Sequence, residues 1–258
     1  MPYKPFDLSG KVALVTGGNS GIGLGMAEAM AMAGADICIW GSNAQKNAEA
    51  EAAIARHGAK VAALQVDVGD EAAVEAGFAE TLKRFGRVDG CFANAGVSGR
   101  GNTKTFAEMT TEEWHRVLKV NLDGVFWTMR AAARHMVERG GGGVLVPTAS
   151  LAAISGAQRN EHYAATKGAV ISMTKSLCVE FARNGIRANA ILPGWIETPM
   201  TAKTFAWDKF AANVKPRIPM RRWGSKEDFG GIAVYLLSDA SSYHTGDTFI
   251  IDGGYYTF

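Results

Sequence analysis

The chain has 258 residues, 47% hydrophobic and 20% charged, which suffices for a single α/β domain with a large core. Its 27 basic and 25 acidic residues are interspersed and give a formal net charge of +2, so no basic face is set aside for nucleic acid or anionic lipid. We find no signal-peptide core and no apolar run of about 18 residues, and three separated cysteines in apolar segments indicate small buried side chains, so we expect a cytoplasmic protein.

Short β-rich runs alternate with longer amphipathic patterns along the chain. The predicted strands are 12–16, 36–40, 61–66, 88–93, 143–148, 186–192 and 248–252. The predicted helices are 21–33, 43–57, 70–85, 111–139, 162–183 and 225–238. This order predicts one domain over 1–258, a Rossmann-type, doubly wound, seven-stranded parallel sheet with helices on both faces. Ligands of such sheets sit beyond the carboxyl ends of the strands.

One long irregular stretch covers 194–223. It exceeds the usual loop length of a compact domain, so we interpret it as a partly helical substrate lid, with a plain surface excursion as the alternative. Its large apolar side chains, Trp195, Met200, Phe205 and Trp207, favour apolar walls for the pocket.

A glycine-rich turn separates the first predicted strand from the first helix. Glycines at this place let the backbone turn sharply and approach a pyrophosphate, whose charge is favoured by the free N–H groups of a helix amino terminus. The spacing G-x-x-x-G-x-G differs from the G-x-G-x-x-G of many dinucleotide enzymes, and the alternative is a turn that serves packing alone. The predicted cofactor contacts are Gly17, Asn19, Ser20, Gly21, Ile22 and Gly23.

Two further strand ends carry candidate cofactor contacts. Asp67, followed by Val68 after the third strand, is placed to accept a hydrogen bond from the adenine amino group. After the fourth strand come Asn94, Ala95 and Gly96, which bring backbone close to the cofactor. Each motif alone is more often a turn or a helix cap, so the prediction rests on their joint placement.

Tyr163 and Lys167 are four residues apart and share one face of a predicted helix. A nearby ammonium stabilises a phenolate and lowers its pKa, so the pair is suited to acid/base chemistry. Ser150, at the end of the fifth strand, would polarise a carbonyl while Tyr163 donates the proton. Asn121 would anchor a water that relays protons through Lys167, or alternatively would stabilise a kink in its helix.

The order and spacing of these motifs resemble the short-chain dehydrogenase/reductase family from about Leu8 to Phe258. The matching segments include TGGNSGIG at 16–23, NAG at 94–96, YAATK at 163–167, PGWIETPM at 193–200 and IDGG at 251–254. The resemblance implies an NAD(P)-dependent enzyme acting on a ketone or a secondary alcohol. The implied catalytic tetrad is Asn121, Ser150, Tyr163 and Lys167.

The resemblance also assigns the nicotinamide half of the cofactor and the assembly. Lys167 is implied to bind the nicotinamide ribose alongside Tyr163, and the nicotinamide contacts are implied to be Pro193, Gly194, Ile196 and Thr198. Members of the family are usually tetramers built partly from the long helices after the fourth and fifth strands, which implies a homotetramer here.

The choice between NAD and NADP stays open in the sequence. Many NAD-preferring relatives carry an acidic residue at the end of the second strand, which repels a 2′-phosphate. Here that place holds Trp40 and Gly41, followed by Ser42 and Asn43 as neutral donors, without a carboxylate or the arginine of many NADP-preferring relatives. Nothing rejects the phosphate, which favours NADP.

The polar stretch 159–162, Arg-Asn-Glu-His, would suit a hydroxylated substrate if it lined the pocket; facing solvent or a neighbouring subunit is the alternative. The five histidines show no metal-ligand spacing, so we expect no catalytic metal. Three other functions compete with the oxidoreductase interpretation. They are a non-catalytic NAD(P)-binding regulator or scaffold, an epimerase or dehydratase, which usually needs a separate substrate domain, and a nucleic-acid binder, which needs a basic surface.

Overall fold

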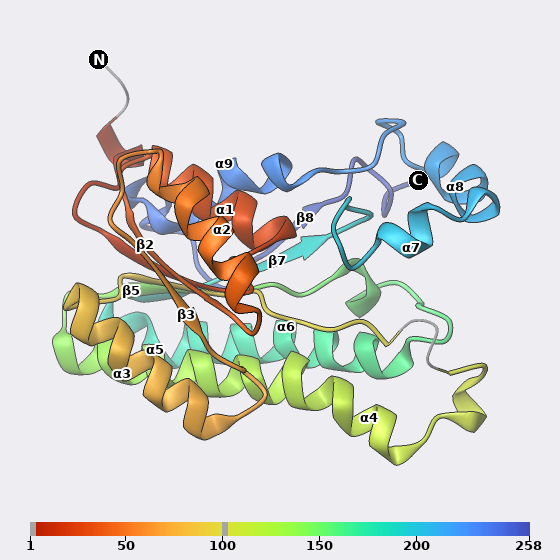
Figure 1. The fold of residues 1–258 in the computed structure, drawn as a ribbon, viewed down its shortest axis with the longest axis horizontal. Coiled ribbons are helices and arrows are strands. Elements are labelled where there is room, and N and C mark those ends of the chain that lie inside the picture. The colour runs from red at the N-terminus through yellow and green to blue at the C-terminus, as the bar shows by residue number, and fades with distance from the viewer. Residues whose placement is uncertain (1–3, 100–102) are drawn as a thin grey trace.

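The computed structural model describes residues 4–99 and 103–258 as a parallel sheet between two layers of helices (Figure 1). The strands are β1 Val12–Thr16, β2 Asp36–Gly41, β3 Val61–Gln65, β4 Gly90–Ala93, β5 Gly143–Pro147, β6 Ile186–Ala188, β7 Ala190–Pro193 and β8 Thr248–Ile251. The helices are α1 Gly21–Met32, α2 Ala44–Ala55, α3 Glu71–Phe85, α4 Thr111–Leu118, α5 Gly124–Arg139, α6 Glu161–Phe181, α7 Ala202–Phe205, α8 Asp208–Val214 and α9 Gly230–Leu237.

The main sheet has six parallel strands in the order β3-β2-β1-β4-β5-β6. From β1 the chain first builds outward through β2 and β3, and then returns to place β4 on the other side of β1. This reversal opens a crevice between the carboxyl ends of β1 and β4, because the connections there leave in opposite directions. The predicted doubly wound α/β class is confirmed.

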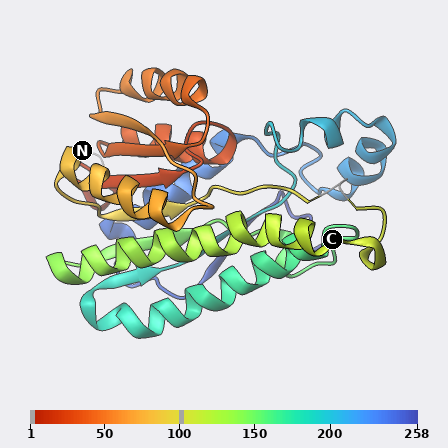
Figure 2. The same ribbon diagram turned by 60° about the horizontal axis from the view of Figure 1, so that its bottom comes forward.

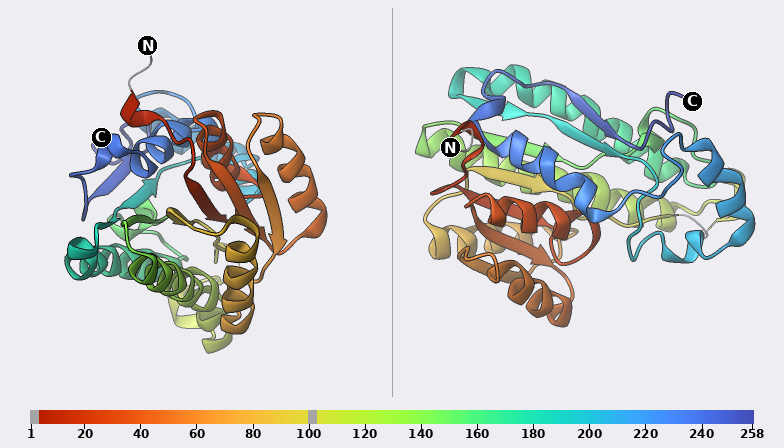
Figure 3. Two further views of the ribbon diagram at one scale, coloured as in Figure 1. Left: turned by 90° about the vertical axis from the view of Figure 1, so that its left-hand side faces the viewer. Right: turned by 90° about the horizontal axis from the view of Figure 1, so that it is seen from above.

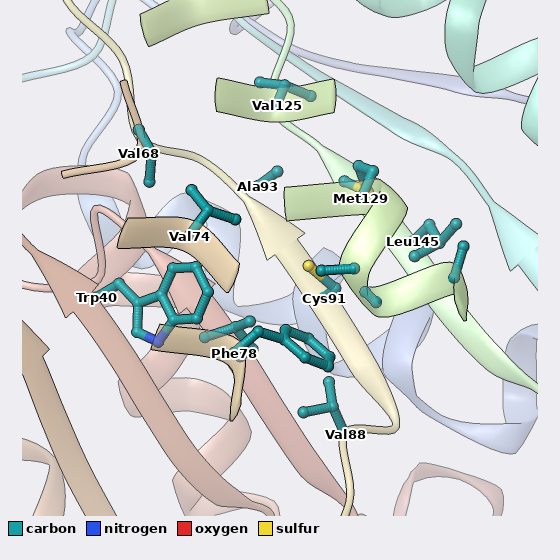
Figure 4. Close-up of a cluster of buried hydrophobic side chains, with 14 of the residues drawn as sticks. Trp40, Val68, Val74, Phe78, Val88, Cys91, Ala93, Val125, Met129 and Leu145 are labelled. Atoms are coloured by element: carbon teal, nitrogen blue, oxygen red, sulfur yellow. The ribbon is translucent and has the colours of Figure 1, made fainter. Parts of the chain in front are cut away.

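Side chains of the strands alternate between two cores, one on each face of the sheet. Leu14 and Cys91 face the core formed with α3, α5 and α6, whereas Val15 and Phe92 face the core formed with α1, α2 and α9. Figures 2 and 3 show the two helical layers, and Figure 4 shows side chains of the first core, among them Trp40, Phe78 and Met129. Both faces are therefore covered, which explains the nearly continuous apolar runs of the strands.

The free cysteines follow this layering. Cys38 and Cys91 are fully buried, and burial raises the pKa of their thiols to about 11 and about 12. Cys178 is half-buried. The prediction of small buried cysteines is therefore confirmed for the two that lie in strands, which are poor nucleophiles because thiolate formation is disfavoured.

The strand predicted over 186–192 is divided into β6 and β7. Between them Asn189 donates its side-chain amide to the carbonyl of His244 and accepts from the N–H of Asp247, at 2.9 and 3.0 Å. These bonds tie the chain to the segment before β8, with which β7 pairs in parallel. The expected seven-stranded sheet is thus a six-stranded sheet and a two-stranded pair, which are joined by a bridge between Thr148 and Ile191.

Two predicted helices also differ in detail. The helix predicted over 111–139 consists of α4 and α5 with a π-helical turn, Lys119–Asp123, between them. The helix predicted over 225–238 begins with a 3-10 turn, Lys226–Phe229, before α9. The apolar period continues through both departures, so the sequence pattern did not reveal them.

The amino-terminal edge of the sheet is held by a buried carboxylate. Asp89 accepts hydrogen bonds from the N–H of Val12 at 2.9 Å, from Arg139 at 2.6 Å and from Arg87 at 2.5 Å. Burial alone would raise the pKa of Asp89, but these bonds outweigh it and hold that pKa below its ordinary value. The cluster joins β1, β4 and α5 at the edge opposite the crevice.

Across residues 4–99 and 103–258, no helix combines the length and the apolar character that crossing a lipid bilayer requires. Over the same ranges, no group of three or more His, Cys, Asp and Glu side chains is arranged to hold a metal ion.

Candidate active site

A cavity of about 360 Å³ lies at the carboxyl ends of β1, β2, β3, β4, β5 and β7. It is the place where the switch in strand order predicts a ligand. Most of the residues predicted as site residues line it: Gly17, Asn19, Ser20, Gly21, Ile22, Ser42, Asp67, Val68, Asn94, Ala95, Gly96, Ser150, Tyr163, Lys167, Pro193, Gly194, Ile196 and Thr198.

Three predicted site residues are not among the residues that line this cavity in the described part of the chain. Gly23 lies in α1, where an added Cβ would come within 2.4 Å of the Gly17 carbonyl oxygen, so it serves the packing of the turn. Asn43 accepts a hydrogen bond from the N–H of Lys46 at 2.9 Å and thereby caps α2. Asn121 is fully buried behind the cavity wall.

The glycine turn brings backbone to the cavity with few side chains in the way. Gly17 and Gly21 have positive φ angles of 64° and 53°, a region that favours glycine. A Cβ at Gly17 would lie 3.0 Å from the Cα of Ala95, so β1 and the segment after β4 approach closely. Ser20, at the N-cap of α1, makes no side-chain cap among the described residues, which leaves first-turn N–H groups for an anion. These features fit the pyrophosphate of a dinucleotide.

Two threonines that sequence reasoning missed fix the strand ends. Thr16, almost fully buried, accepts hydrogen bonds from the N–H groups of Asn94 and Ala95, both at 3.0 Å. Thr148 donates its hydroxyl to Asn94 at 3.2 Å, and its carbonyl accepts from Lys167 at 2.7 Å. A threonine at the end of a buried strand was the only available signal, and it is a common feature of strands.

Ser150, Tyr163 and Lys167 meet in the cavity. Both hydroxyl-bearing side chains line the cavity, and the Ser150 hydroxyl is near enough to act on the Tyr163 phenol as a hydrogen-bonding group. The Lys167 Nζ lies 5.6 Å from the centre of the Tyr163 ring, and it donates to the backbone carbonyl of Thr148. The spacing of four residues along α6 therefore puts the phenol and the amine on one face, as predicted, and β5 delivers the serine to them.

Burial governs the protonation of Tyr163 and Lys167. Burial raises the pKa of the Tyr163 phenol above its ordinary value, although the hydrogen bond with Ser150 acts in the opposite direction. Burial also lowers the pKa of Lys167 to about 8. Burial thus disfavours the charged form of both groups, and the effect of Lys167 on the pKa of Tyr163 stays a prediction.

Asn121 lies in the π-helical turn and is joined to the segment after β4. Its Oδ1 accepts from the N–H of Val97 at 2.8 Å, and its Nδ2 donates to the Val97 carbonyl at 2.9 Å. A Cβ at Gly96 would lie 3.2 Å from the Asn121 Oδ1 and 3.8 Å from the Lys167 Nζ. Asn121 and the Lys167 amine therefore both approach Gly96, and the two bonds to Val97 hold Asn121 against the cavity wall.

Comparison with known proteins gives the family. A family model described as "Enoyl-(Acyl carrier protein) reductase" matches residues 17–256. The chain is 38% identical to the 2-dehydro-3-deoxy-D-gluconate 5-dehydrogenase of Bacillus subtilis (strain 168) over 253 residues, 98% of this chain and 97% of that protein. A short-chain type dehydrogenase/reductase from Mycobacterium marinum has a similar structure, with a TM-score of 0.92 and 36% identity over 98% of both chains. The chain belongs to the short-chain dehydrogenase/reductase family.

Another solved member of the short-chain dehydrogenase/reductase family bears on the cofactor. A gluconate 5-dehydrogenase from Burkholderia cenocepacia J2315, in complex with NADP and tartrate, has a TM-score of 0.91 and 36% identity over 99% of this chain and 98% of that one. The predicted reaction class is confirmed: the chain is an NAD(P)-dependent oxidoreductase of this family that acts on alcohol and ketone groups.

The stretch 194–223 is partly helical as predicted and contains α7 and α8 (Figure 1). Its first part, which carries the nicotinamide motif of short-chain dehydrogenase/reductases, lines the cavity as far as Thr201. Phe205 stacks on Trp223 with ring centres 4.1 Å apart, and Trp195 meets Phe210 edge-on at 5.0 Å. Met200 lines the cavity, whereas Trp207 is mostly exposed. Aromatic packing thus gives this segment a core of its own.

The polar stretch before Tyr163 divides between surface and interior. Arg159 is exposed, whereas Asn160 and His162 are buried, and the His162 Nε2 lies 3.2 Å from the Glu113 Oε1 of α4. Among the described residues that line the cavity, none comes from 159–162. The stretch therefore lies outside the pocket of this dehydrogenase/reductase: Arg159 faces solvent, as in the alternative interpretation, whereas the buried Asn160 and His162 fit neither interpretation.

Proposed function

We propose that the chain transfers a hydride between NADP(H) and a ketone or secondary alcohol, with Tyr163 as acid/base, Ser150 as carbonyl polariser and Lys167 and Asn121 in support. The observation that carries the assignment is the convergence of the Ser150 and Tyr163 side chains beside the buried amine of Lys167, inside the cavity. A phenol and a hydroxyl converging on one point are suited to a carbonyl oxygen on which charge develops.

In the reductive direction, bound nicotinamide supplies the hydride. Ser150 donates a hydrogen bond to the substrate oxygen, and Tyr163 transfers its proton to that oxygen as negative charge grows there. The raised pKa of Tyr163 keeps the phenol protonated at neutral pH, as a proton donor requires. In the oxidative direction the phenol must first lose its proton, so alcohol oxidation gains rate as pH rises.

Lys167 and Asn121 support this proton transfer. We assign Lys167 to the nicotinamide ribose and to the return of the proton, because its Nζ lies beside the Tyr163 ring with a pKa near 8. Asn121 is assigned to a water that links Lys167 to solvent, since its amide lies behind Gly96 close to the same amine. The nicotinamide contacts are assigned to Pro193, Gly194, Ile196 and Thr198, which line the cavity.

The adenosine end of the cofactor is assigned to the ends of β2 and β3. Asp67 and Val68 line that part of the cavity and are assigned to adenine, with Asp67 as acceptor for its amino group. Asn19 and Ser42 line the cavity as uncharged hydrogen-bonding groups, and they support NADP over NAD because the β2 end, unlike the β3 end with Asp67, holds no carboxylate to repel a 2′-phosphate.

A cofactor and substrate panel tests this proposal. Purified protein is mixed with NADPH, NADH, NADP or NAD and with ketones, sugars and sugar acids, steroids, acyl thioesters and alcohols, and the absorbance of the reduced nicotinamide is followed. We include sugar acids because relatives are named for them. We expect turnover with higher kcat/KM for NADP(H). A clear preference for NAD(H) would overturn the cofactor assignment.

We further propose that the protein is a cytoplasmic homotetramer and that 194–223 is a substrate lid. The tetramer is supported by α5 and α6, which form an outer layer (Figure 2) with Phe126 44% and Val179 81% exposed. Such apolar groups on long helices suit an interface between copies. Light scattering should give a mass four times the 27.4 kDa chain, and a mass of one chain at micromolar concentration would contradict the assembly.

A further inference from the structure

A buried amide in α2 ties together three elements at the adenosine end of the cavity. Asn47 is 4% exposed. Its Nδ2 donates to the carbonyls of Gly41 and Leu64 at 2.9 and 3.1 Å, and its Oδ1 accepts from the Asn19 Nδ2 at 2.7 Å. The ends of β2 and β3 and the glycine turn are therefore linked through one side chain.

This arrangement fixes the orientation of Asn19. Both N–H groups of Asn47 are used by backbone carbonyls, so only its oxygen can meet Asn19, and Asn19 must present its nitrogen to it. A primary amide has two N–H groups, so the Asn19 amide can donate the other one to a ligand in the cavity that it lines. With the opposite orientation Asn19 would offer that ligand an acceptor oxygen.

The same pair occupies the space that an acidic side chain at the end of β2 would need. A Cβ at Gly41 would lie 2.1 Å from the Asn19 Nδ2 and 2.4 Å from the Asn47 Oδ1, both closer than any Cβ contact. A carboxylate at this position would hold a ribose diol and repel a phosphate. Instead, the β2 end offers glycine, the exposed Ser42 and the Asn19 amide.

We propose that Asn47 is a positioning residue that holds the Asn19 amide as a donor to the 2′-phosphate of the cofactor, and so sets the preference for NADP over NAD. A phosphate is recognised by N–H donors, and donors fixed before binding lose less entropy when it binds. This inference rests on the proposed use of NADP and adds the residue that produces it.

The test measures binding of two probes that lack nicotinamide, adenosine 2′,5′-bisphosphate and 5′-AMP, by calorimetry. The parent chain should bind the bisphosphate more tightly. In Asn47→Ala the affinity for the bisphosphate should fall about tenfold, as for the loss of one hydrogen bond to a charged group, with little change for 5′-AMP. Asn19→Ala should have the same effect, and the double variant should lose no more than Asn19→Ala alone.

Two further variants separate positioning from stability. Asn47→Ala also leaves the Gly41 and Leu64 carbonyls without their donor, so it will be less stable. Asp70→Ala is a matched control, because it removes the cap of α3, where Asp70 accepts from the N–H groups of Ala72 and Ala73. Asp70 follows the β3 end that is assigned to adenine, which both probes carry, so the ratio of the two affinities should stay unchanged. Gly41→Ala pushes the amide pair apart without removing it and should lower the ratio, even if Asn47→Ala does not fold.

The outcomes distinguish failure of the inference about Asn47 from failure of the proposed use of NADP. If the parent chain does not discriminate between the two probes, the proposed use of NADP fails. If the parent discriminates but Asn47→Ala and Gly41→Ala weaken both probes equally, or if the losses in the double variant add, Asn47 has only a structural role and the inference is overturned.

Discussion

Replacing Tyr163 by phenylalanine is expected to lower kcat for ketone reduction by about 10³-fold, within the range of about 10² to 10⁴ that a positioned acid/base contributes. The substitution removes only the hydroxyl on which Ser150 acts, so the ring and its contact with Lys167 remain. Cofactor binding, measured by the change in nicotinamide fluorescence, should be retained, because the ring still fills the wall of the cavity.

The matched control for this variant is Tyr235→Phe. Tyr235 lies in α9, where its hydroxyl is 3.0 Å from the His244 Nδ1, outside the residues that line the cavity in the described ranges. The Tyr235→Phe variant loses the same hydroxyl oxygen from the same residue type and should keep the kcat of the parent chain. Normal reductase activity in Tyr163→Phe would contradict the acid/base role of Tyr163. The interpretation of a cofactor-binding protein without turnover would then have to be considered again.

Replacing Lys167 by methionine is expected to lower kcat/KM by about 10²-fold. Methionine fills nearly the same volume but has no charge and no donor for the Thr148 carbonyl. Because Lys167 is assigned to both the ribose and proton return, the cofactor KM should rise and kcat should fall. A variant with unchanged kinetics would contradict both roles.

The same variant should change how stability depends on pH. Burial lowers the pKa of Lys167 from 10.5 to about 8, so the folded chain gives up this proton more readily than the unfolded chain. The cost of burying the ammonium, about 3 kcal/mol, is present in full below pH 8 and is relieved as pH rises toward 10.5. In denaturant titrations, the free energy of unfolding of the parent chain should be higher at pH 9.5 than at pH 7.5. This difference should be absent in Lys167→Met. An equal pH dependence in both would contradict the lowered pKa.

The sequence predicted the features that depend on local spacing. Tyr163 and Lys167 meet because four residues make one helical turn, and Gly17 and Gly21 lie at the crevice because a strand precedes them and a helix follows. The layer order also followed, since buried parallel strands must be covered on both faces. These are short-range consequences of chain geometry.

The features that escaped prediction depend on contacts between distant segments. Asn47 and Asn19 are 28 residues apart in the sequence, and Thr16 accepts a hydrogen bond from Asn94, which is 78 residues away. Local sequence patterns therefore could not predict either pair. The π-helical turn at Asn121 leaves the apolar period intact. The raised pKa of Tyr163 follows from the whole surrounding of the phenol, which a spacing of four residues cannot supply.

The Asp89 cluster has a consequence for how such a chain can change over time. It joins β1, β4 and α5 at one rim of the sheet, whereas the reacting groups gather at the other rim. Substitutions that change thermal stability through the Asp89 cluster and substitutions that change the choice of substrate therefore fall at separate sets of positions. Natural or laboratory selection can therefore stabilise the edge of the sheet that holds Asp89 while it changes the active-site edge, with little trade-off between stability and activity.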